Sequence, residues 1–463
     1  MTQSKEKSDL KSIVPVDSLR QINLDAAGLD IGAEEIYACV PADRDEQSVR
    51  VFLTFTADLY ALADWLTSCG IKSVAMESTG VYWIPVYEIL EAKGFEVCLV
   101  NARHLKNVAQ KKTDVLDCQW LQQLHTYGLL RGSFRPPEEI CALRALARHR
   151  GNLVRYRSAH IQHMQKALQM MNLRLTEVVS DITGLTGLRI IRTILTGEHD
   201  PHRLASLRDA KCAKSEEEIA RALQGNYKAE HLFVLKQALA QYDFYHGQIQ
   251  ECDAEMEKLY ASFTPLKKDD QGESSPRTAK QHKPRKNEAH FDLATALYRT
   301  VGVDLTAIPG IDALTAQTVI SETGLDMSPW PTVKHYTSWL GLAPNTKKSG
   351  GKVLSSHTNK TQNRANTALR IAAQTLSHSH SALGGFYRRM RAKVGAAQAN
   401  VATAHKLARI IYHLLKYRKA YADPGEDYYE QQYREHAIHN LKRKAAVFGL
   451  ELVPAAPQPS LVS

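Results

Sequence analysis

A chain of 463 residues, with a net charge of +10 and a hydrophobic fraction of 44%, is long enough for about three domains with their own cores. No apolar run approaches the ~20 residues of a membrane helix, so we expect no membrane partner. The polar stretch 1–12 predicts no secretory signal, and the seven scattered cysteines include no C-x-x-C pair. We therefore expect a cytoplasmic protein with neither a disulfide framework nor a zinc knuckle.

The charge is distributed unevenly along the chain. The stretch from Met327 to Ala422 contains sixteen Lys or Arg residues and no Asp or Glu. A solvated surface normally mixes the two signs, so such a long stretch without an acid predicts a polyanionic partner. Nucleic acid is the first candidate. An anionic membrane is a poor second, because no amphipathic membrane helix stands out in this region.

The first part of the chain alternates between strand and helix patterns. Strands are predicted at 22–32, 35–41, 49–56, 73–78 and 96–101, with helices at 57–69, at 80–93 and around Asp114. Three strands in a meander followed by β-α-β units predict an RNase H-like α/β domain, which we place at 20–136. The right-handed crossover rule then brings strands 22–32 and 73–78 side by side.

Two aspartates lie on the helix that follows the last of these strands. Asp114 and Asp117 are three residues apart, so on a helix they share one face, with Cβ atoms roughly 5–6 Å apart. Two like charges this close favour a divalent cation between them, and such cations prefer carboxylate oxygens. The alternative is a solvated first turn, with Thr113 as N-cap and both acids stabilised by the helix dipole.

Two further carboxylates lie upstream on apolar strands. Asp30 and Glu77 each belong to a run that is predicted to be buried, where neither solubility nor a helix dipole explains an acid. Adjacent strands would place both acids at one edge of the sheet, where they would meet Asp114 and Asp117. For Asp30 taken alone, a turn or capping role is the alternative.

Two long helical patterns follow this domain. Residues 137–182 contain no internal proline, and 232–259 show a second run of apolar residues at helical spacings. We predict a coiled-coil arm at 137–263 with a looser insert between its helices. The first helix is basic, so Arg148 and Arg155 are candidates for contact with a phosphate backbone. A purely structural, oligomerising arm is the alternative.

The chain continues with a polar stretch and a second domain. Residues 264–290 are charged and nearly free of large apolar groups, which predicts a linker or disordered insert. We place a mostly helical domain at 291–422 and a partly helical tail at 423–463. In the domain, Gly310 follows a proline between two helical patterns, which predicts a helix-hairpin-helix-like unit that binds a DNA phosphate. A plain helical packing unit is the alternative.

One serine lies in a glycine-rich stretch inside the acid-free region. Lys347, Lys348 and Lys352 surround Ser349 in the sequence KKSGGK. Lysines around a hydroxyl would bind a scissile phosphate and stabilise an alkoxide nucleophile. A flexible loop without a chemical role is the alternative.

Four more basic residues are predicted to contact nucleic acid. Lys111 and Lys112 directly precede the helix of Asp114, and Arg364 and Arg370 lie on a helix predicted from Asn363. Basic side chains on helices are well suited to contacts with a phosphate backbone.

Six motifs, in this order, resemble those of the transposases of insertion-sequence family one-ten, the DEDD/serine transposases guided by a bridge RNA. The motifs are GLDIG (28–32), MESTG (76–80), KTDVLD (112–117), IPGI (308–311), GLAP (341–344) and SGGK (349–352). The resemblance covers nearly the whole chain, and the ordered set is much more specific than any single motif.

The resemblance implies a mechanism as well as a fold. It implies a RuvC-like domain in which Asp30, Glu77, Asp114 and Asp117 bind Mg²⁺, and a C-terminal transposase domain in which Ser349 attacks DNA and becomes attached to one DNA end. It also implies a bacterial or archaeal, nucleoid-associated protein that forms a dimer or tetramer through its coiled-coil arm. By the same resemblance, a non-coding RNA selects donor and target DNA. We therefore expect an α/β plus α protein that acts as a DNA transposase.

Other functions stay open from the residues alone. In a RuvC-like metal-dependent nuclease, such as a junction resolvase, water attacks the phosphate and Ser349 is structural. In a non-catalytic nucleic-acid-binding protein, the basic C-terminal region carries the whole function. A proofreading exonuclease fits less well, because Gly32 stands two residues after Asp30, where those enzymes place a glutamate.

Overall fold

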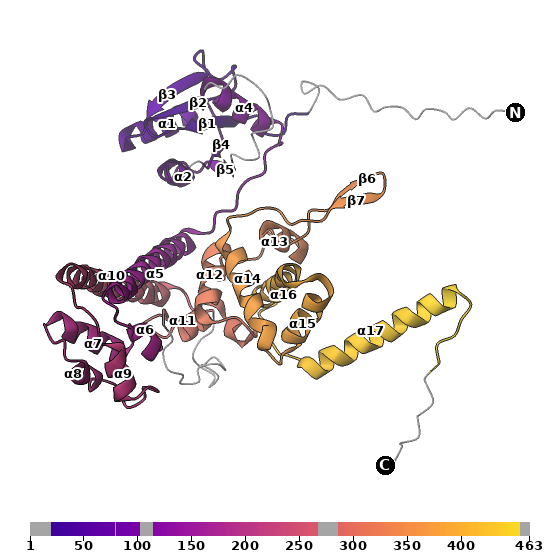
Figure 1. Ribbon diagram of the computed structural model, residues 1–463. Helices are drawn as coiled ribbons and strands as arrows, with labels where there is room; N and C mark the ends of the chain where they lie inside the picture. Colours follow the sequence, from indigo (N-terminus) through magenta and orange to yellow (C-terminus); the bar gives the residue numbers. More distant parts are fainter. Residues whose placement is uncertain (1–19, 79, 102–113, 267–285, 454–463) are drawn as a thin grey trace. The chain divides into compact units, whose positions relative to one another are not determined.

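The computed structural model describes residues 20–78, 80–101, 114–266 and 286–453. The chain forms two units, one ending at Arg135 and the other beginning at Pro136 (Figure 1). The five segments expected from the sequence divide the chain more finely, and most of the expected linker lies outside the described residues. Those finer boundaries stay predictions.

The first unit is built on a five-stranded sheet. Its strands are β1 (Ala26–Ile31), β2 (Glu35–Cys39), β3 (Val49–Leu53), β4 (Ser73–Glu77) and β5 (Glu96–Val100). They lie in the order β3-β2-β1-β4-β5, in which β2 is antiparallel to both neighbours and β1, β4 and β5 are parallel. The predicted meander is confirmed, and so is the prediction that the strands of Asp30 and Glu77 are neighbours.

The two faces of this sheet are covered by different helices. Alternate residues such as Leu29 and Met76 are fully buried in one apolar cluster with side chains from α1 (Thr56–Ser68) and α2 (Trp83–Ala92). The opposite face packs against α4 (Asp114–Thr126). Because strand side chains alternate between faces, every second residue of β1 and β4 is directed at α4.

The second unit contains the two long helices expected from the sequence, α5 (Glu138–Met170) and α10 (Ala229–Ser262). They run antiparallel, and their apolar seams meet where Leu153 packs with Ile249 and Met256. A buried ion pair lies beside this contact, with Nη2 of Arg150 donating to Asp253 Oδ2 at 3.1 Å. The pairing of α5 and α10 thus occurs within one chain.

The sequence pattern predicts a helical run to residue 182, whereas α5 ends at Met170. Asn172 adopts a left-handed conformation with φ of 57°, which an α-helix cannot contain. The apolar residues beyond it belong to an insert of short helices that shares a core with the adjoining ends of α5 and α10. These helices are α6 (Leu175–Val178), α7 (Leu185–Leu195), α8 (Pro201–Ala205) and α9 (Glu216–Ala222).

The rest of the second unit is mostly helical, as predicted. Its α-helices are α11 (Leu293–Val301), α12 (Ala313–Thr323), α13 (Val333–Trp339), α14 (Arg364–Thr375), α15 (Ala382–Val394), α16 (Ala396–Tyr417) and α17 (Glu426–Val447). Helix α16 contacts α13, α14 and α15, and its Tyr412 is buried and donates a hydrogen bond to the carbonyl of Trp330 at 2.8 Å. Helix α17 contacts α15 and has no buried residue; it projects from this group of helices in Figure 1.

Two 3₁₀ turns connect these helices, η2 (Leu305–Ala307) and η3 (Leu376–His378). None of the helices in the described ranges is both long enough and apolar enough to cross a membrane.

Candidate functional site

Asp30 and Glu77 lie at the same edge of the sheet. Leu29 of β1 stands opposite Met76 of β4 in parallel register, so Asp30 and Glu77 are the next neighbouring pair. Asp30 is the penultimate residue of its strand and Glu77 the last, and both are partly buried. Two acids therefore meet at the carboxyl ends of adjacent strands.

The side chain of Asp30 is directed toward α4. Gly28, two residues earlier on the same face, touches the helix so closely that a Cβ there would lie 2.3 Å from the carbonyl oxygen of Cys118. From Gly28 to Asp30 the strand advances ~6.6 Å, and from Cys118 back to Asp114 the helix covers ~6 Å. The two aspartates thus lie at similar heights on facing elements, provided that the helix and strand run in opposite directions.

A contact at the far end of α4 establishes this direction. Nε2 of His125, near the end of the helix, lies 3.0 Å from the hydroxyl of Ser73, the first residue of β4. Helix α4 is therefore antiparallel to β4, and its first residue, Asp114, lies toward the edge that carries Glu77. Glu77 shares a strand face with Ser73, because four residues separate them.

The pKa of Tyr37 is affected by acids from both β1 and α4. Tyr37 stands opposite Asp30 on β2 and donates a hydrogen bond to Glu35 at 3.2 Å. That hydrogen bond is the largest cause of the raised pKa of Tyr37, and the charges on Asp114 and Asp30 raise it further. The acids on β1 and α4 thus act on one common neighbour.

Two cysteines far apart in the sequence meet next to these acids. Cys39 stands opposite Gly28 on β2, and its thiol lies beside that of Cys118 on α4. Each thiol donates to a backbone carbonyl, Cys39 to that of Val40 at 3.5 Å and Cys118 to that of Val115 at 3.2 Å. This contact and burial raise the pKa of the Cys118 thiol, and the charge on Asp30 adds to the effect. The sequence indicated only scattered cysteines. The register between β1 and β2 and the docking of α4 were needed to find the pair.

Carboxylate oxygens are the donors that hard divalent cations prefer, so the chemistry of this donor set fits such a cation. Among the residues that the structure describes, however, no three His, Cys, Asp or Glu side chains are close enough to hold a metal ion. Asp114 is exposed and Asp117 partly buried on the first turn of α4. The four acids therefore share an edge without forming a closed ligand set.

Ser349 lies in the second unit, on a β-hairpin where the sequence predicted a loop. Strands β6 (Lys347–Ser349) and β7 (Lys352–Ser355) pair antiparallel, with Ser349 opposite Lys352. Gly350 and Gly351 form the turn with φ of 53° and 77°, the left-handed values that a type I′ turn needs. Ser349 and the three lysines of the hairpin are all exposed. The hydroxyl is thus presented at a cationic tip.

Comparison with known proteins identifies the family. Residues 27–172 match the DEDD transposase model of the IS110 type, described as a transposase, and residues 304–388 match the model of the Transposase IS116/IS110/IS902 family. The chain belongs to the IS110 family of transposases. A stretch of 114 residues is also 30% identical to the insertion element IS110 uncharacterized 43.6 kDa protein of Streptomyces coelicolor. That stretch covers 24% of this chain and 28% of the relative.

The two matched segments of this IS110-family protein contain every residue that the sequence predicted for the site. Asp30, Glu77, Asp114 and Asp117 lie in the first segment, and Ser349 lies in the second. The structure brings the acids to one edge of the first unit, while the hairpin of Ser349 belongs to the second.

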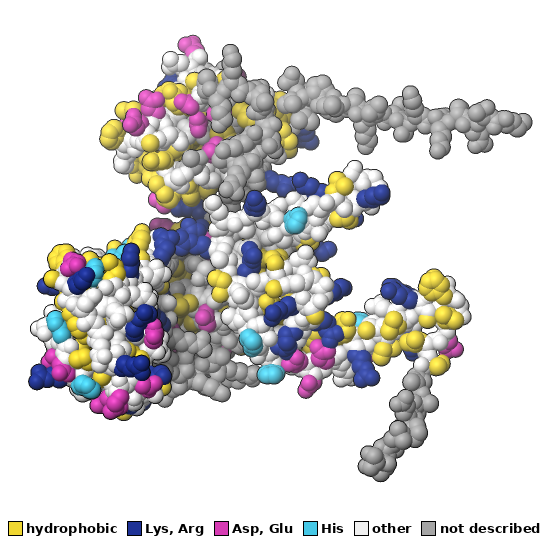
Figure 2. Space-filling view, viewed as in Figure 1, with side chains coloured by type: hydrophobic (Ala, Val, Ile, Leu, Met, Phe, Trp, Pro, Cys, Tyr) yellow, Lys and Arg dark blue, Asp and Glu magenta, His cyan; other side chains and the backbone are white. Residues whose placement is uncertain are grey.

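The predicted nucleic-acid-binding residues of the transposase are mostly exposed. Lys111 and Lys112 lie outside the described residues, and the exposed set is Arg148, Arg155, Lys347, Lys348, Lys352, Arg364 and Arg370. Arg364 lies beside α5, because its Nη1 would be 3.9 Å from a Cβ at Gly151. Lys and Arg side chains are spread over the visible surface of the C-terminal helices and over the β6–β7 hairpin (Figure 2).

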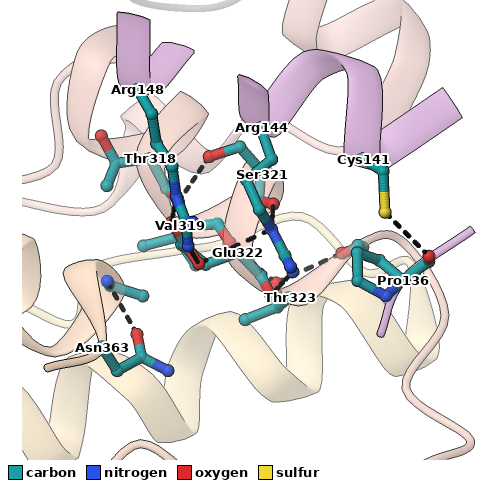
Figure 3. A network of polar contacts seen from close by, with 12 residues as sticks. Pro136, Cys141, Arg144, Arg148, Thr318, Val319, Ser321, Glu322, Thr323 and Asn363 are labelled. Atoms are coloured by element: carbon teal, nitrogen blue, oxygen red, sulfur yellow. Dashed lines mark hydrogen bonds and ion pairs between the residues drawn. The ribbon is translucent and has the colours of Figure 1, made fainter. Parts of the chain in front are cut away.

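Arg148 also has an intramolecular partner. Its Nε and Nη2 donate to both carboxylate oxygens of Glu322 on α12, at 3.0 and 2.8 Å, and the Glu322 side chain is only 7% exposed. Arg144, one turn earlier, donates to the backbone carbonyls of Ser321 and Glu322 at 2.9 Å (Figure 3). These two arginines join α5 to α12, so the guanidinium of Arg148 is shared between a structural contact and any contact with nucleic acid.

Gly310 occupies the turn before α12. Its φ is 85°, and a Cβ there would lie 2.9 Å from the carbonyl of Ala372 on α14, so close packing and left-handed geometry both require glycine. The carboxylate of Asp312 caps α12 by accepting a hydrogen bond from the amide of Thr315 at 2.8 Å. A phosphate at this helix end would therefore compete with Asp312 for the free amides.

Proposed function

We propose that this protein is a DNA transposase that cleaves and exchanges DNA strands at an insertion sequence. The observation that carries the proposal is the placement of Asp30 and Glu77 on adjacent parallel strands, on the face covered by the helix that starts at Asp114. The strand order β3-β2-β1-β4-β5 with β2 antiparallel supports an RNase H/RuvC-like domain. The two matched transposase models support the reaction class.

In this proposal Asp30, Glu77, Asp114 and Asp117 hold Mg²⁺. A divalent cation held there would supply Lewis-acid chemistry, which makes the scissile phosphate more electrophilic and an attacking hydroxyl easier to deprotonate. The sheet fixes Asp30 and Glu77, whereas α4 positions the other two acids, so the packing of α4 on β1 sets the shape of the ligand set.

Ser349 is the proposed nucleophile. Its Oγ forms a bond to phosphorus and loses its proton, while the bond from phosphorus to a deoxyribose oxygen breaks and that oxygen takes up a proton. Lys347, Lys348 and Lys352 would offset the charge that develops on the phosphate oxygens. The resulting phosphoserine diester keeps the DNA end attached, so that a deoxyribose hydroxyl of another strand can displace the serine.

A nuclease that uses water at the same carboxylates is the second candidate. The observation that favours it is the environment of Ser349, because its side chain is exposed and forms no hydrogen bond with the residues that the structure describes. A serine nucleophile needs a base within hydrogen-bond reach in the reacting complex. In the transposase proposal, that base is supplied when hairpin and carboxylates meet at the DNA, within one subunit or between two.

We further propose that a non-coding RNA selects the donor and target DNA, and that the active assembly is a dimer or tetramer. The acid-free stretch from Met327 to Ala422 supports binding to a nucleic acid backbone, which DNA and RNA share. The RNA and the oligomer come from the family expectation, and the dependence on RNA is tested in the same experiment as the chemistry.

The deciding experiment is a covalent-adduct assay. The full chain is incubated with Mg²⁺, junction DNA of the element and RNA transcribed from its flanks, and the products are separated on a denaturing gel. Wild type is compared with Ser349→Ala and with Asp114→Asn, and each mixture is repeated without RNA. We expect a protein–DNA band for the wild type alone, and its dependence on RNA tests the guide.

Two outcomes would contradict parts of this proposal. Equal DNA cleavage by wild type and Ser349→Ala, without an adduct, would establish the water-dependent nuclease. Cleavage by Asp114→Asn at the wild-type rate would remove the metal site from the proposal. Circular dichroism of each variant provides the folding control, because Ser349 and Asp114 are both exposed and their substitution should leave the fold intact.

A further inference from the structure

A cavity of about 390 Å³ lies between α15, α16 and α17, and none of the described residues assigned above lines it. Its lining residues are Ala382, Leu383, Lys406, Arg409, Ile410, His413, Tyr421, Pro424, Tyr428, Tyr429 and Gln432. The volume is within the range of small-molecule and cofactor sites. The lining combines cations with aromatic rings, and none of these described residues is acidic.

Two of the cations come from one face of α16. Lys406 and Arg409 are three residues apart on a helix, so their side chains are neighbours. Neither forms an ion pair among the described residues. Burial, followed by repulsion from Arg409, lowers the pKa of Lys406, and the same two causes lower the pKa of His405. The cavity wall thus carries positive charge that is not balanced locally.

The acids closest to the cavity in sequence form no ion pair with Lys406 or Arg409 among the described residues. Glu426 pairs with Arg388 and lies 3.4 Å from His380, and Glu430 pairs with Arg389. Asp423 accepts a hydrogen bond from the amide of Ala382 at 3.3 Å. Glu426 and Glu430 therefore hold α17 on α15. Asp427, also in the first turn of α17, is exposed, and among the described residues it forms no ion pair with Lys406 or Arg409.

Aromatic rings surround the ammonium group of Lys406. Its Nζ lies 3.9 Å from the ring centroid of Phe386 and 5.6 Å from that of Tyr429. Cation–π contacts of this kind hold the lysine in place without removing its charge. Tyr428, also in the lining, is 54% exposed, so its ring is accessible to a ligand in the cavity.

We propose that this cavity binds an unpaired nucleotide of a single-stranded nucleic acid, with the base stacked on Tyr428 and the phosphate held between Lys406 and Arg409. Aromatic platforms beside cations are the general means of binding single strands without reading their sequence. Duplex DNA keeps its bases stacked on each other and offers only its phosphates. The site therefore selects unpaired strands, such as an exposed DNA end or an RNA loop.

The proposal goes beyond the strand-exchange chemistry and does not use its residues. Fluorescence anisotropy of the full chain is measured with labelled single-stranded DNA and RNA of about twelve nucleotides, with a duplex, and with a strand of equal charge that lacks bases. The variants are Tyr428→Ala and Arg409→Gln, both at exposed side chains. Matched controls are Tyr60→Ala, where the tyrosine is 48% exposed on α1, and Arg189→Gln on α7.

We expect each cavity variant to weaken single-strand binding about tenfold, while duplex binding changes little. The plot of log affinity against log salt has a negative slope, and Arg409→Gln should make this slope less steep by about 0.7. That is the contribution of one phosphate contact on a single strand. The base-free strand should bind wild type weakly, and Tyr428→Ala should not weaken it further. A preference between DNA and RNA would name the source of the nucleotide.

Equal affinities for the cavity variants and their controls would overturn the proposal. Undiminished binding of the base-free strand would overturn it as well, because the cavity would then be an anion site. Ser349→Ala and Asp114→Asn are included in every series, and both should bind single strands as wild type does. Loss of their adducts with binding intact separates this site from the proposed recombination chemistry.

Discussion

Gly28 of β1 and Cys118 of α4 are packed backbone to backbone, with no room for a side chain between them. A Cβ on residue 28 would lie 2.3 Å from the Cys118 carbonyl oxygen and 2.4 Å from the amide nitrogen of Gln122. Gly28→Ala must therefore push α4 off the sheet, and we expect a loss of about 1–3 kcal/mol in the free energy of unfolding. Because α4 carries Asp114 and Asp117, adduct formation should be lost too. Urea unfolding and the adduct assay measure the two effects.

Gly247→Ala is the matched control for this substitution. Gly247 lies inside α10, and a Cβ there meets nothing within 4 Å. Alanine should therefore stabilise the helix by about 0.5–1 kcal/mol. Wild-type stability and activity in Gly28→Ala would show that α4 does not need this contact to position its acids.

The elements around Gly28 were predictable because their information is local. Apolar runs and turn signals predicted the five strands, and the crossover rule predicted that the strands of Asp30 and Glu77 are adjacent. The end of α5 was placed too late, since the left-handed conformation of Asn172 has no strong signal in the apolar spacing. The hairpin of Ser349 was predicted as a loop, because its short strands carry lysines instead of an apolar alternation.

The contacts that complete the site join residues far apart in the sequence, and the spacing of residue types does not predict such contacts. The thiols of Cys39 and Cys118 meet only after β2 and α4 have docked on β1. Arg148 and Glu322 are 174 residues apart, and either one alone has the sequence signature of an ordinary surface charge. The cavity beside Lys406 likewise depends on three helices whose mutual packing no single pattern describes.

Glu322 is the buried centre of the contact between α5 and α12. Glu322→Gln keeps the side-chain volume but removes the charge that Arg144 and Arg148 share, so we expect a loss of about 1–3 kcal/mol in the free energy of unfolding. Arg148→Gln should cost less, because the Arg148 side chain is 45% exposed and the pair is partly screened by solvent. Urea unfolding of both single variants and the double variant measures their coupling.

The exposed pair of Arg174 and Glu177 provides the comparison. Their side chains are 56% and 62% exposed, so Arg174→Gln should change the stability by less than about 0.5 kcal/mol.

Because Glu322 occupies the Arg148 guanidinium, Arg155→Gln should weaken nucleic-acid binding more than Arg148→Gln. The reverse order in an anisotropy titration would mean that nucleic acid displaces Glu322.

His125 makes the packing of α4 sensitive to acid. Burial lowers the pKa of His125 in the folded chain, so between this lowered value and about 6.5 the unfolded chain binds more protons than the folded one. Stability should therefore fall as the pH drops below about 6.5, and His125→Gln should reduce this loss. Urea midpoints at about pH 7.5 and pH 5.5 measure this loss of stability.

Ser73→Ala is the control. It removes the contact to Nε2 of His125 and keeps the burial of the ring, so it should preserve the acid sensitivity. If Ser73→Ala instead abolishes the acid sensitivity, the contact between His125 and Ser73 is its cause, not the burial of His125.

The turn of the β6–β7 hairpin allows the presentation of Ser349 to be changed without touching the serine. Gly350 has a φ of 53° and a Cβ there meets nothing within 4 Å, so a substitution acts through backbone conformation alone. Gly350→Val places a β-branched residue in the left-handed region and should disrupt the turn, whereas Gly350→Asn creates the Asn-Gly pair that type I′ turns prefer. Because the hairpin is exposed, neither variant should change the free energy of unfolding by more than about 0.5 kcal/mol. In the adduct assay we expect Gly350→Val to lose the protein–DNA band and Gly350→Asn to keep it. A band of equal intensity in both would mean that the chemistry does not depend on the hairpin geometry.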